Sequence, residues 1–229
     1  MTCEAVMILE IPELLNAQEV AYLRQTAREG KFADGALTAR NLPKGYKENL
    51  QLQPTQKQAN EINAIVRRAL ARNERVGDYV MVRDTSLPMI SKYEPGMHYS
   101  RHVDNVLIGW PNPIRTDMSM TIFMHEPDTY DGGELEFDSD LGLKTYKLAS
   151  GGAVIYPTTH YHRVTPVTRG ERLAVVVWIQ SFIADPTQRR IVGDLRHLAS
   201  EFAGKPELKS EHDMLLRSAL DLMRMWVQN

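Results

Sequence analysis

The spacing of apolar residues changes twice along the chain and divides it into three regions. Residues 1–77 have mainly helical spacing, and Asn16 followed by Glu19 has the pattern of a capping box at a helix start. Residues 78–183 alternate with the period of two that is typical of strands, and residues 184–229 return to helical spacing. This order predicts an N-terminal helical region packed on a β core, followed by a C-terminal helical extension.

The central region contains several short apolar stretches separated by turn-forming residues. The expected strands are 79–83, 87–93, 117–124, 134–137, 145–148, 153–156, 162–167 and 173–183. Glycine-rich turns, such as Asp-Gly-Gly at 131–133, lie between them. About eight short strands without intervening helices indicate an antiparallel sandwich or barrel rather than an alternating βαβ fold. The predicted fold class is therefore mainly β with flanking helices.

Two amphipathic segments follow the β region. Residues 185–203 begin with Asp185 and Pro186, a helix cap and a first-turn proline, and residues 207–228 carry a stripe of leucine, alanine and methionine. We expect both segments to be helices that pack on the β core or pair with another subunit. A homo-oligomer formed through these C-terminal helices is therefore one expectation.

Composition narrows the classes of function. The 229 residues include 27 Lys and Arg against 29 Asp and Glu, and this net charge of -2 gives no general affinity for nucleic acid or an anionic membrane. The one cysteine, Cys3, excludes an internal disulfide and a cysteine-based metal site, which leaves His, Asp and Glu as metal ligands. The chain shows neither a signal-peptide pattern nor a run of roughly 18 apolar residues. We expect a cytoplasmic protein.

A His-x-Asp pair and a later histidine suggest a metal site. On a strand, His102 and Asp104 would face the same way and could converge on one point. Two histidines and one carboxylate form the ligand set of non-heme Fe(II) oxygenases, which leaves coordination positions open for substrates. His160 and His162 both qualify as the second histidine, because strand alternation gives them the same orientation.

Arg172 precedes an apolar run at 173–179 that has the composition of a buried strand. A buried guanidinium costs several kcal/mol without an anionic partner, so burial there would indicate an anionic ligand or a protein carboxylate. The residue pattern equally allows Arg172 to face solvent from the preceding turn. Arg169, within the Thr-Arg-Gly turn, is expected to be exposed.

Four stretches occur in the order found in a known family. They are Tyr93-Glu-Pro-Gly through His102-Val-Asp104-Asn105, Tyr-Asp-Gly-Gly-Glu-Leu at 130–135, Tyr156-Pro through His162-Arg-Val-Thr-Pro-Val to Arg172, and Val-Trp-Ile-Gln-Ser-Phe-Ile at 177–183. Together they resemble the Fe(II)/2-oxoglutarate-dependent dioxygenases, and more narrowly the bacterial PKHD-type hydroxylases, which have a prolyl/lysyl-hydroxylase-like domain. The resemblance is strong over residues 79–190.

The resemblance implies a double-stranded β-helix, or jelly roll, over residues 78–183. It implies that His102, Asp104 and His162 bind iron, and it favours His162 over His160 because His162 directly precedes Arg-Val-Thr-Pro-Val. It implies that Arg172 binds the distal carboxylate of 2-oxoglutarate, with Tyr93 as a second donor. A further tyrosine that such enzymes often carry is missing from the strand at 120–124.

The resemblance also implies the reaction, the hydroxylation of a C–H bond with release of succinate and CO2. Fe(II) and 2-oxoglutarate are the expected cofactor and co-substrate, and ascorbate is expected to keep the iron ferrous. The favoured substrate is a prolyl or other amino acid or peptidyl group. A small metabolite, an alkylated nucleobase and a non-catalytic sensor of iron or keto-acid are the alternatives, although the near-neutral charge gives no reason to expect nucleic acid as a partner.

Overall fold

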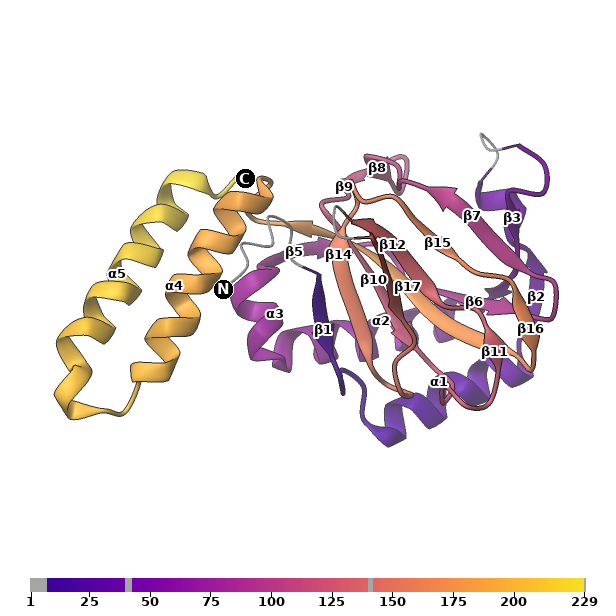
Figure 1. The fold of residues 1–229 in the computed structure, drawn as a ribbon, viewed down its shortest axis with the longest axis horizontal. Helices are drawn as coiled ribbons and strands as arrows, with labels where there is room; N and C mark the ends of the chain where they lie inside the picture. Colours follow the sequence, from indigo (N-terminus) through magenta and orange to yellow (C-terminus); the bar gives the residue numbers. More distant parts are fainter. Residues whose placement is uncertain (1–7, 40–42, 140–141, 229) are drawn as a thin grey trace.

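A computed structural model of the protein describes residues 8–39, 43–139 and 142–228. Antiparallel strands form the body of the molecule, two long helices lie along one side of it, and a helical hairpin extends from one end (Figure 1). The mainly β class with flanking helices is therefore confirmed. No helix in the described part of the chain is both long and apolar enough to cross a membrane.

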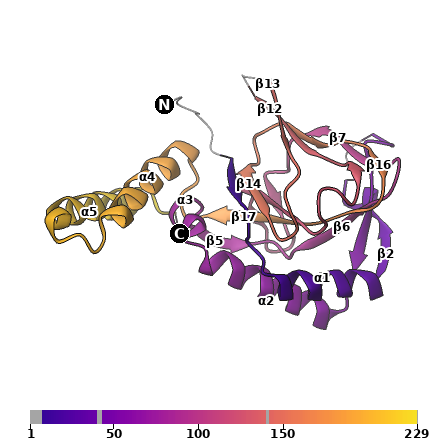
Figure 2. The ribbon, with the colours of Figure 1, turned by 60° about the horizontal axis from the view of Figure 1, so that its bottom comes forward.

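Among the described residues, eight strands form the larger sheet. In spatial order they are β1 (Leu9–Ile11), β14 (Ala153–Pro157), β10 (Met118–Phe123), β17 (Arg172–Ser181), β6 (Met89–Tyr93), β4 (Leu50–Gln53) and β2 (Lys31–Asp34), and β5 (Val82–Thr85) also pairs with β17. Helices α1 (Ala17–Glu29) and α2 (Gln56–Arg72) cover one face of this sheet (Figure 2).

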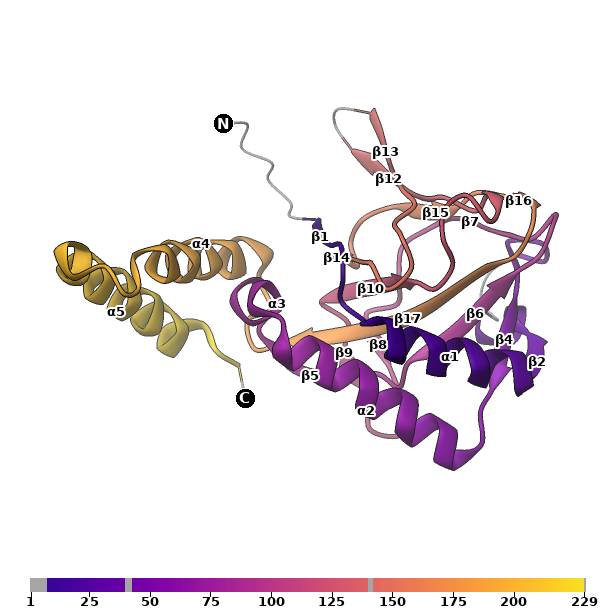
Figure 3. The ribbon, with the colours of Figure 1, turned by 90° about the horizontal axis from the view of Figure 1, so that it is seen from below.

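A smaller sheet lies on the other side of the larger one, away from α1 and α2 (Figure 3). Its strands are β13 (Gly142–Tyr146), β12 (Leu135–Ser139), β15 (His162–Val164), β7 (His98–His102) and β3 (Lys47–Glu48). Two further sheets of the described structure have two strands each. One pairs β8 (Leu107–Ile108) with β9 (Ile114–Arg115), and the other pairs β11 (Asp131–Gly132) with β16 (Val167–Arg169). The two facing sheets form the jelly roll.

Strand alternation gives the two faces of the larger sheet different polarity. On β17, Leu173, Val175, Val177 and Ile179 belong to the core cluster shared with the helices. Arg172, Val176 and Trp178, which alternate with these residues along the strand, line a cavity between the sheets. Because side chains of a strand point alternately to opposite faces, the apolar residues under the helices direct the others into the interior.

The N-terminal region differs from its expected, mainly helical form. The helix expected at Asn16 is present with its capping box, and a second helix follows a capping box at Thr55, but the region also contributes β1 to β4 to the sheets. The expected strand at 79–83 begins instead in a short helix, α3 (Glu74–Tyr79), and β5 starts at Val82. Strands of two to four residues are too short to produce a recognisable alternation, so only their pairing partners define them.

The C-terminal helices occur close to the expected ranges. Helix α4 (Pro186–Phe202) and helix α5 (Lys209–Trp226) form a hairpin, joined by a short 3-10 turn at Pro206–Leu208. Near the barrel, Val192 packs with Met81 and Ile183, and Leu222, Met223 and Trp226 pack against this group. On α5 only Ala219 is buried. The homo-oligomer through this hairpin stays a prediction.

A pair of helical glycines provides a test of how α4 docks. A Cβ atom on Gly193 would lie 2.2 Å from a ring carbon of Tyr79, whereas one on Gly77 would meet nothing within 4 Å. We expect Gly193→Ala to lower the free energy of unfolding by about 1–3 kcal/mol through overpacking. Gly77→Ala, the matched control in α3, should raise it by about 0.5–1 kcal/mol because alanine favours the helix. Urea unfolding of both variants measures the difference, and equal effects would contradict this packing.

Candidate active site

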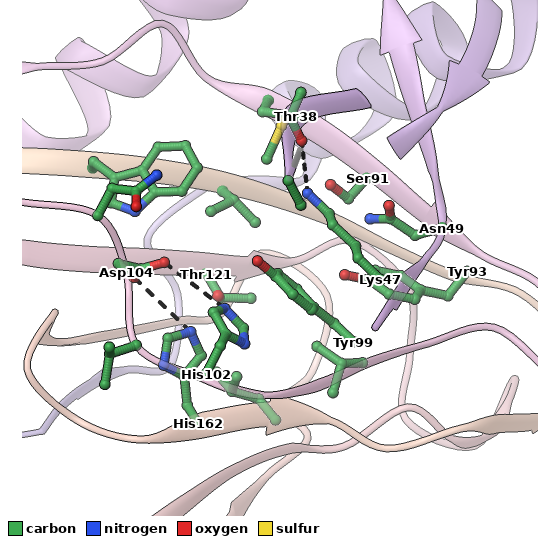
Figure 4. A pocket seen from close by; sticks show the side chains of 18 of the residues that line it. Thr38, Lys47, Asn49, Ser91, Tyr93, Tyr99, His102, Asp104, Thr121 and His162 are labelled. Carbon is green, nitrogen blue, oxygen red and sulfur yellow. Dashed lines mark hydrogen bonds and ion pairs between the residues drawn. The ribbon is translucent and has the colours of Figure 1, made fainter. Parts of the chain in front are cut away.

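His102, Asp104 and His162 come together between the two sheets (Figure 4). His102 is the last residue of β7 and lies opposite His162, the first residue of β15, in the antiparallel register. Nε2 of His102 is 3.9 Å from Oδ1 of Asp104, and Nε2 of His162 is 3.9 Å from Oδ2. One potential ligand atom from each residue lies within 4.8 Å of the other two. Since metal–ligand bonds of this kind are roughly 2.0–2.2 Å long, one ion between them could contact all three.

Hydrogen bonds to the backbone define the tautomers of both imidazoles. Nδ1 of His102 lies 2.8 Å from the carbonyl oxygen of Ser100, and Nδ1 of His162 lies 3.0 Å from that of His160. A carbonyl oxygen can only accept, so each Nδ1 carries the proton and donates it. The neutral form of each imidazole then has its lone pair on Nε2, the ring atom that lies 3.9 Å from an Asp104 oxygen, as a metal ligand requires.

Neighbouring side chains hold the three groups in place. The hydroxyl of Ser119, a fully buried residue of β10, donates a hydrogen bond to Oδ2 of Asp104. The ring of Tyr99 stacks on His102 with centroids 3.6 Å apart, and Tyr156 meets His162 edge-on at 5.0 Å. The carboxylate is thus supported from the larger sheet although both imidazoles belong to the smaller one.

Burial keeps His102 neutral. Desolvation, assisted by the adjacent His162, lowers the pKa of His102 to about 4, although the Ser100 carbonyl and Asp104 act in the opposite direction. His102 is 7% exposed. An imidazole in this environment is unprotonated at neutral pH, which is the form that binds a metal.

Arg172 is buried in the same cavity without a carboxylate partner. It is 2% exposed, its Nε has no hydrogen-bond partner, and no ion pair involves it within the described ranges. It lies opposite Tyr93 in the β17–β6 register, and its guanidinium carbon is 5.0 Å from the centre of the Tyr93 ring. Burial raises the pKa of Tyr93, so its phenol stays protonated and able to donate. These two donors suit an anionic group.

Gly133 makes room for the arginine. Its φ of +68° belongs to the left-handed region, and a Cβ there would lie 2.9 Å from Cδ of Arg172 and 3.0 Å from Val167. The Asp-Gly-Gly segment, interpreted from the sequence as a turn, thus also allows the backbone to approach Arg172 closely.

The cavity has a volume of about 300 Å³. Figure 4 shows His102, Asp104 and His162 grouped at one side of it, with Tyr93 standing away from them and Lys47 and Asn49 entering from the N-terminal strands. Val164 and Val176 are among its apolar walls. A small concave space with a few convergent polar groups is typical of a small-molecule site.

Several other polar residues lie outside this cavity or outside the strands. His160 precedes β15 in a turn, so strand parity does not apply to it, and it does not line the cavity. Asp104 follows the end of β7 and also lies outside a strand, contrary to the assumption of two strand positions. Arg169 pairs with Asp131 at the surface. Arg101 is exposed and lies over the ring of Tyr161, 3.7 Å from its centre.

Lys47, Asn49 and Ser119 were missed by the sequence interpretation. Lys47 and Asn49 belong to a short N-terminal segment without a recognisable pattern, and Ser119 lies in a strand that otherwise looks like apolar core. A polar residue at alternate positions of β10 was the one available signal, since Ser119 and Thr121 share the face opposite to Met118 and Met120.

Comparison with known proteins shows the family to which the chain belongs. Residues 88–180 match the model of the 2OG-Fe(II) oxygenase superfamily, a span that contains β6, β7, β15 and most of β17. The fold, the match and the convergent histidines and aspartate define a 2OG-Fe(II) oxygenase. The chain is 34% identical to a PKHD-type hydroxylase of Maricaulis maris, covering 97% of this chain and 100% of that one. It is 37% identical to one from Picosynechococcus sp., with 96% and 99% covered. The chain belongs to the PKHD-type hydroxylases.

Solved structures share the fold. A prolyl-4-hydroxylase of Pseudomonas putida has a TM-score of 0.53 at 21% identity and covers 76% of this chain and 92% of its own. A prolyl hydroxylase from Trichoplax adhaerens, in complex with a hypoxia inducible factor peptide fragment, has a TM-score of 0.56 at 19% identity, with 75% and 82% covered. At these identities the likeness establishes the jelly roll.

The depressed pKa of His102 predicts how the metal-free protein responds to acid. Its pKa of about 4 in the folded protein lies below the value of about 6.5 in an unfolded chain, so the unfolded state binds more protons between these values. The free energy of unfolding should therefore fall as the pH falls from about 6.5 toward about 4. Urea unfolding at several pH values, with a chelator present, measures this free energy. Its dependence on pH should be weaker in His102→Asn than in the wild type. The surface variant His197→Asn should retain it, and equal slopes in the two variants would refute the assignment.

Proposed function

We propose that this protein is an Fe(II)- and 2-oxoglutarate-dependent dioxygenase that hydroxylates a C–H bond of an amino acid or peptidyl substrate and releases succinate and CO2. One observation carries the proposal: the cavity that receives two imidazoles and a carboxylate also contains a buried arginine with no carboxylate partner among the described residues. The first group fits a divalent metal, and the second fits a dicarboxylic keto-acid.

His102, Asp104 and His162 would hold the metal. Imidazole and carboxylate donors suit ferrous iron, and three protein ligands leave positions open for other ligands. The hydrogen bonds at Nδ1 keep that nitrogen occupied and present Nε2 of each ring as the metal-binding atom, and Ser119 orients the carboxylate. When bound, iron and 2-oxoglutarate supply the oxidation, and the protein positions them and limits the access of water.

Arg172 and Tyr93 would bind the far carboxylate of 2-oxoglutarate. A guanidinium matches a carboxylate with two parallel hydrogen bonds, and the phenol of Tyr93 adds a donor. The nearly complete burial of Arg172 means that the carboxylate would meet it away from water, where the interaction is stronger. Gly133 preserves the space that the arginine occupies.

The substrate class rests on the relatives. Those compared are named PKHD-type hydroxylases, and two solved structures of the same fold are named prolyl hydroxylases, one of them with a peptide bound. We therefore place prolyl and other amino acid or peptidyl groups first. Ascorbate is part of the proposal as the reductant that keeps the iron ferrous.

The metal site is tested by a pair of histidine variants. We expect His162→Ala to lower Fe(II) affinity at least tenfold and to abolish succinate formation, because one of three ligands is lost. His160→Ala should bind iron almost as the wild type does, since its side chain lies outside the cavity. Anaerobic Fe(II) titration and quantification of succinate by mass spectrometry measure both. Wild-type protein that forms no succinate, or loss of iron binding in the His160 variant alone, would overturn the assignment.

The keto-acid site is tested by a pair of arginine variants. Hydrogen bonds to charged groups contribute roughly 1.5–3 kcal/mol, so Arg172→Ala should raise the apparent constant for 2-oxoglutarate by about tenfold to a few hundredfold. Fe(II) affinity should barely change. Arg172→Lys should restore part of the loss, because an ammonium cannot form the planar two-pronged contact.

Arg169→Ala is the matched control for these titrations. Arg169 is exposed and paired with Asp131, so its removal should leave 2-oxoglutarate binding intact. The reverse pattern, with Arg169→Ala impaired and Arg172→Ala normal, would show that the carboxylate binds elsewhere.

A further inference from the structure

The cavity contains more hydrogen-bond donors than its proposed metal and keto-acid require. Besides Nε of Arg172, buried atoms without a hydrogen-bond partner include Nδ2 and Oδ1 of Asn49 and Nε1 of Trp178, and all three residues line the cavity. Asn49 is 3% exposed. The three nitrogen atoms among them, on Arg172, Asn49 and Trp178, are N–H donors. Buried donors without an acceptor are costly unless a ligand accepts from them.

Lys47 adds a second buried cation to the same cavity. It lies on β3 opposite Tyr99 and is 7% exposed, with its ammonium 5.0 Å from the centre of the Tyr99 ring. In Figure 4 its side chain extends across the cavity toward Thr38. Nζ donates a 2.8 Å hydrogen bond to the Thr38 hydroxyl, and no carboxylate pairs with it within the part of the chain that is described.

One neutral acceptor does not satisfy this ammonium. An ammonium has three N–H donors, and Thr38 Oγ1 also accepts from Gln51 Nε2 at 3.0 Å. Burial lowers the pKa of Lys47 to about 8, opposed by the more distant carboxylates of Asp104 and Asp34, so the group is still mainly charged at pH 7. A charged group held in this way stabilises the protein little and is suited to binding an anion.

The charges of the proposed complex leave Lys47 uncompensated. A ferrous ion with the Asp104 carboxylate has one net positive charge, and Arg172 has another. The two carboxylates of 2-oxoglutarate balance these two charges. Lys47 then remains as an extra positive charge at a buried position, where an unpaired charge is unfavourable. A further anionic group would restore the balance.

We propose that Lys47 binds a carboxylate of the substrate that is hydroxylated, with Asn49 as a neighbouring donor. This inference rests on the proposed function and specifies its substrate: a free amino acid, a small carboxylic acid or the C-terminal residue of a peptide. An internal residue of a polypeptide has no carboxylate on its backbone and would leave Lys47 unpaired. The volume of about 300 Å³ lies at the lower end of the range of small-molecule sites, roughly 300–1,000 Å³, which suits a short acid.

Acetate and its neutral analogue acetamide test the site without knowledge of the natural substrate. The protein is labelled with 13C-lysine and loaded with Zn(II), a diamagnetic substitute for iron, and with 2-oxoglutarate. The Lys47 signal is identified by its loss in Lys47→Met. We expect acetate, but not acetamide, to shift this signal. In calorimetric titrations, acetate should bind at least tenfold more weakly to Lys47→Met than to the wild type. Lys57→Met, which removes an exposed lysine of α2, should bind acetate as the wild type does.

Adding 2-oxoglutarate before acetate shows whether Lys47 binds a carboxylate of the co-substrate or one of the substrate. If 2-oxoglutarate alone shifts the Lys47 signal and acetate then adds nothing, Lys47 binds the co-substrate and the substrate assignment is wrong. If neither acetate nor acetamide shifts the signal of the loaded protein, the carboxylate site is wrong. If the wild type binds neither Zn(II) nor 2-oxoglutarate, the proposed function itself fails, and calorimetric titration of both detects this separately.

Thermal unfolding distinguishes ligand binding from a structural role. If Lys47 served only to hold Thr38, Lys47→Met would lower the Tm of the metal-free protein. We expect its Tm to be unchanged or higher, because the variant removes a buried charge and retains an apolar chain of similar length. A lower Tm together with normal acetate binding would overturn the proposal.

Discussion

The alternation of side chains along β17 is the constraint on which the site depends. Its odd-numbered residues from Leu173 to Ile179 are apolar and pack under α1 and α2, and this orientation directs Arg172 into the space between the sheets. Burying each apolar side chain contributes roughly 1.5–3 kcal/mol, which offsets the several kcal/mol that an unpaired buried guanidinium costs. A register slip of one residue would exchange the two faces, so the core and the arginine are specified together.

The proposed metal site connects the two sheets of the jelly roll. Its imidazoles come from paired ends of β7 and β15 in the smaller sheet, whereas the carboxylate is held by Ser119 from the larger one. A ligand that binds all three groups would therefore stabilise the contact between the sheets as well as the loop that carries Asp104.

The cavity is electrostatically incomplete without its ligands. Arg172 and Lys47 are both buried, and neither has a carboxylate partner among the described residues. A protein selected only for stability would replace such groups by apolar ones, because buried unpaired charges are unfavourable. Their presence in one small space, beside the neutral imidazole of His102, is what the proposed function requires of a site for anions and a metal.

The sequence by itself determined the elements with strong local signals. The capping box of α1, the largely apolar strand β10, the apolar run of β17 and the His102–Asp104 pair are each visible in short windows. The resemblance to a known family added Tyr93, His162 and Arg172 as site residues, and the structure brings all of these side chains to one cavity.

Only the tertiary structure decided which distant segments complete the site. Strands β3 and β7 have little alternation of their own and exist because they pair with each other and with β15. That pairing brings Lys47 of the N-terminal region to Tyr99, and the packing of the two sheets brings Ser119 to Asp104. Contacts between residues far apart in the chain leave no periodic pattern in either segment, so no local window of the sequence contains them.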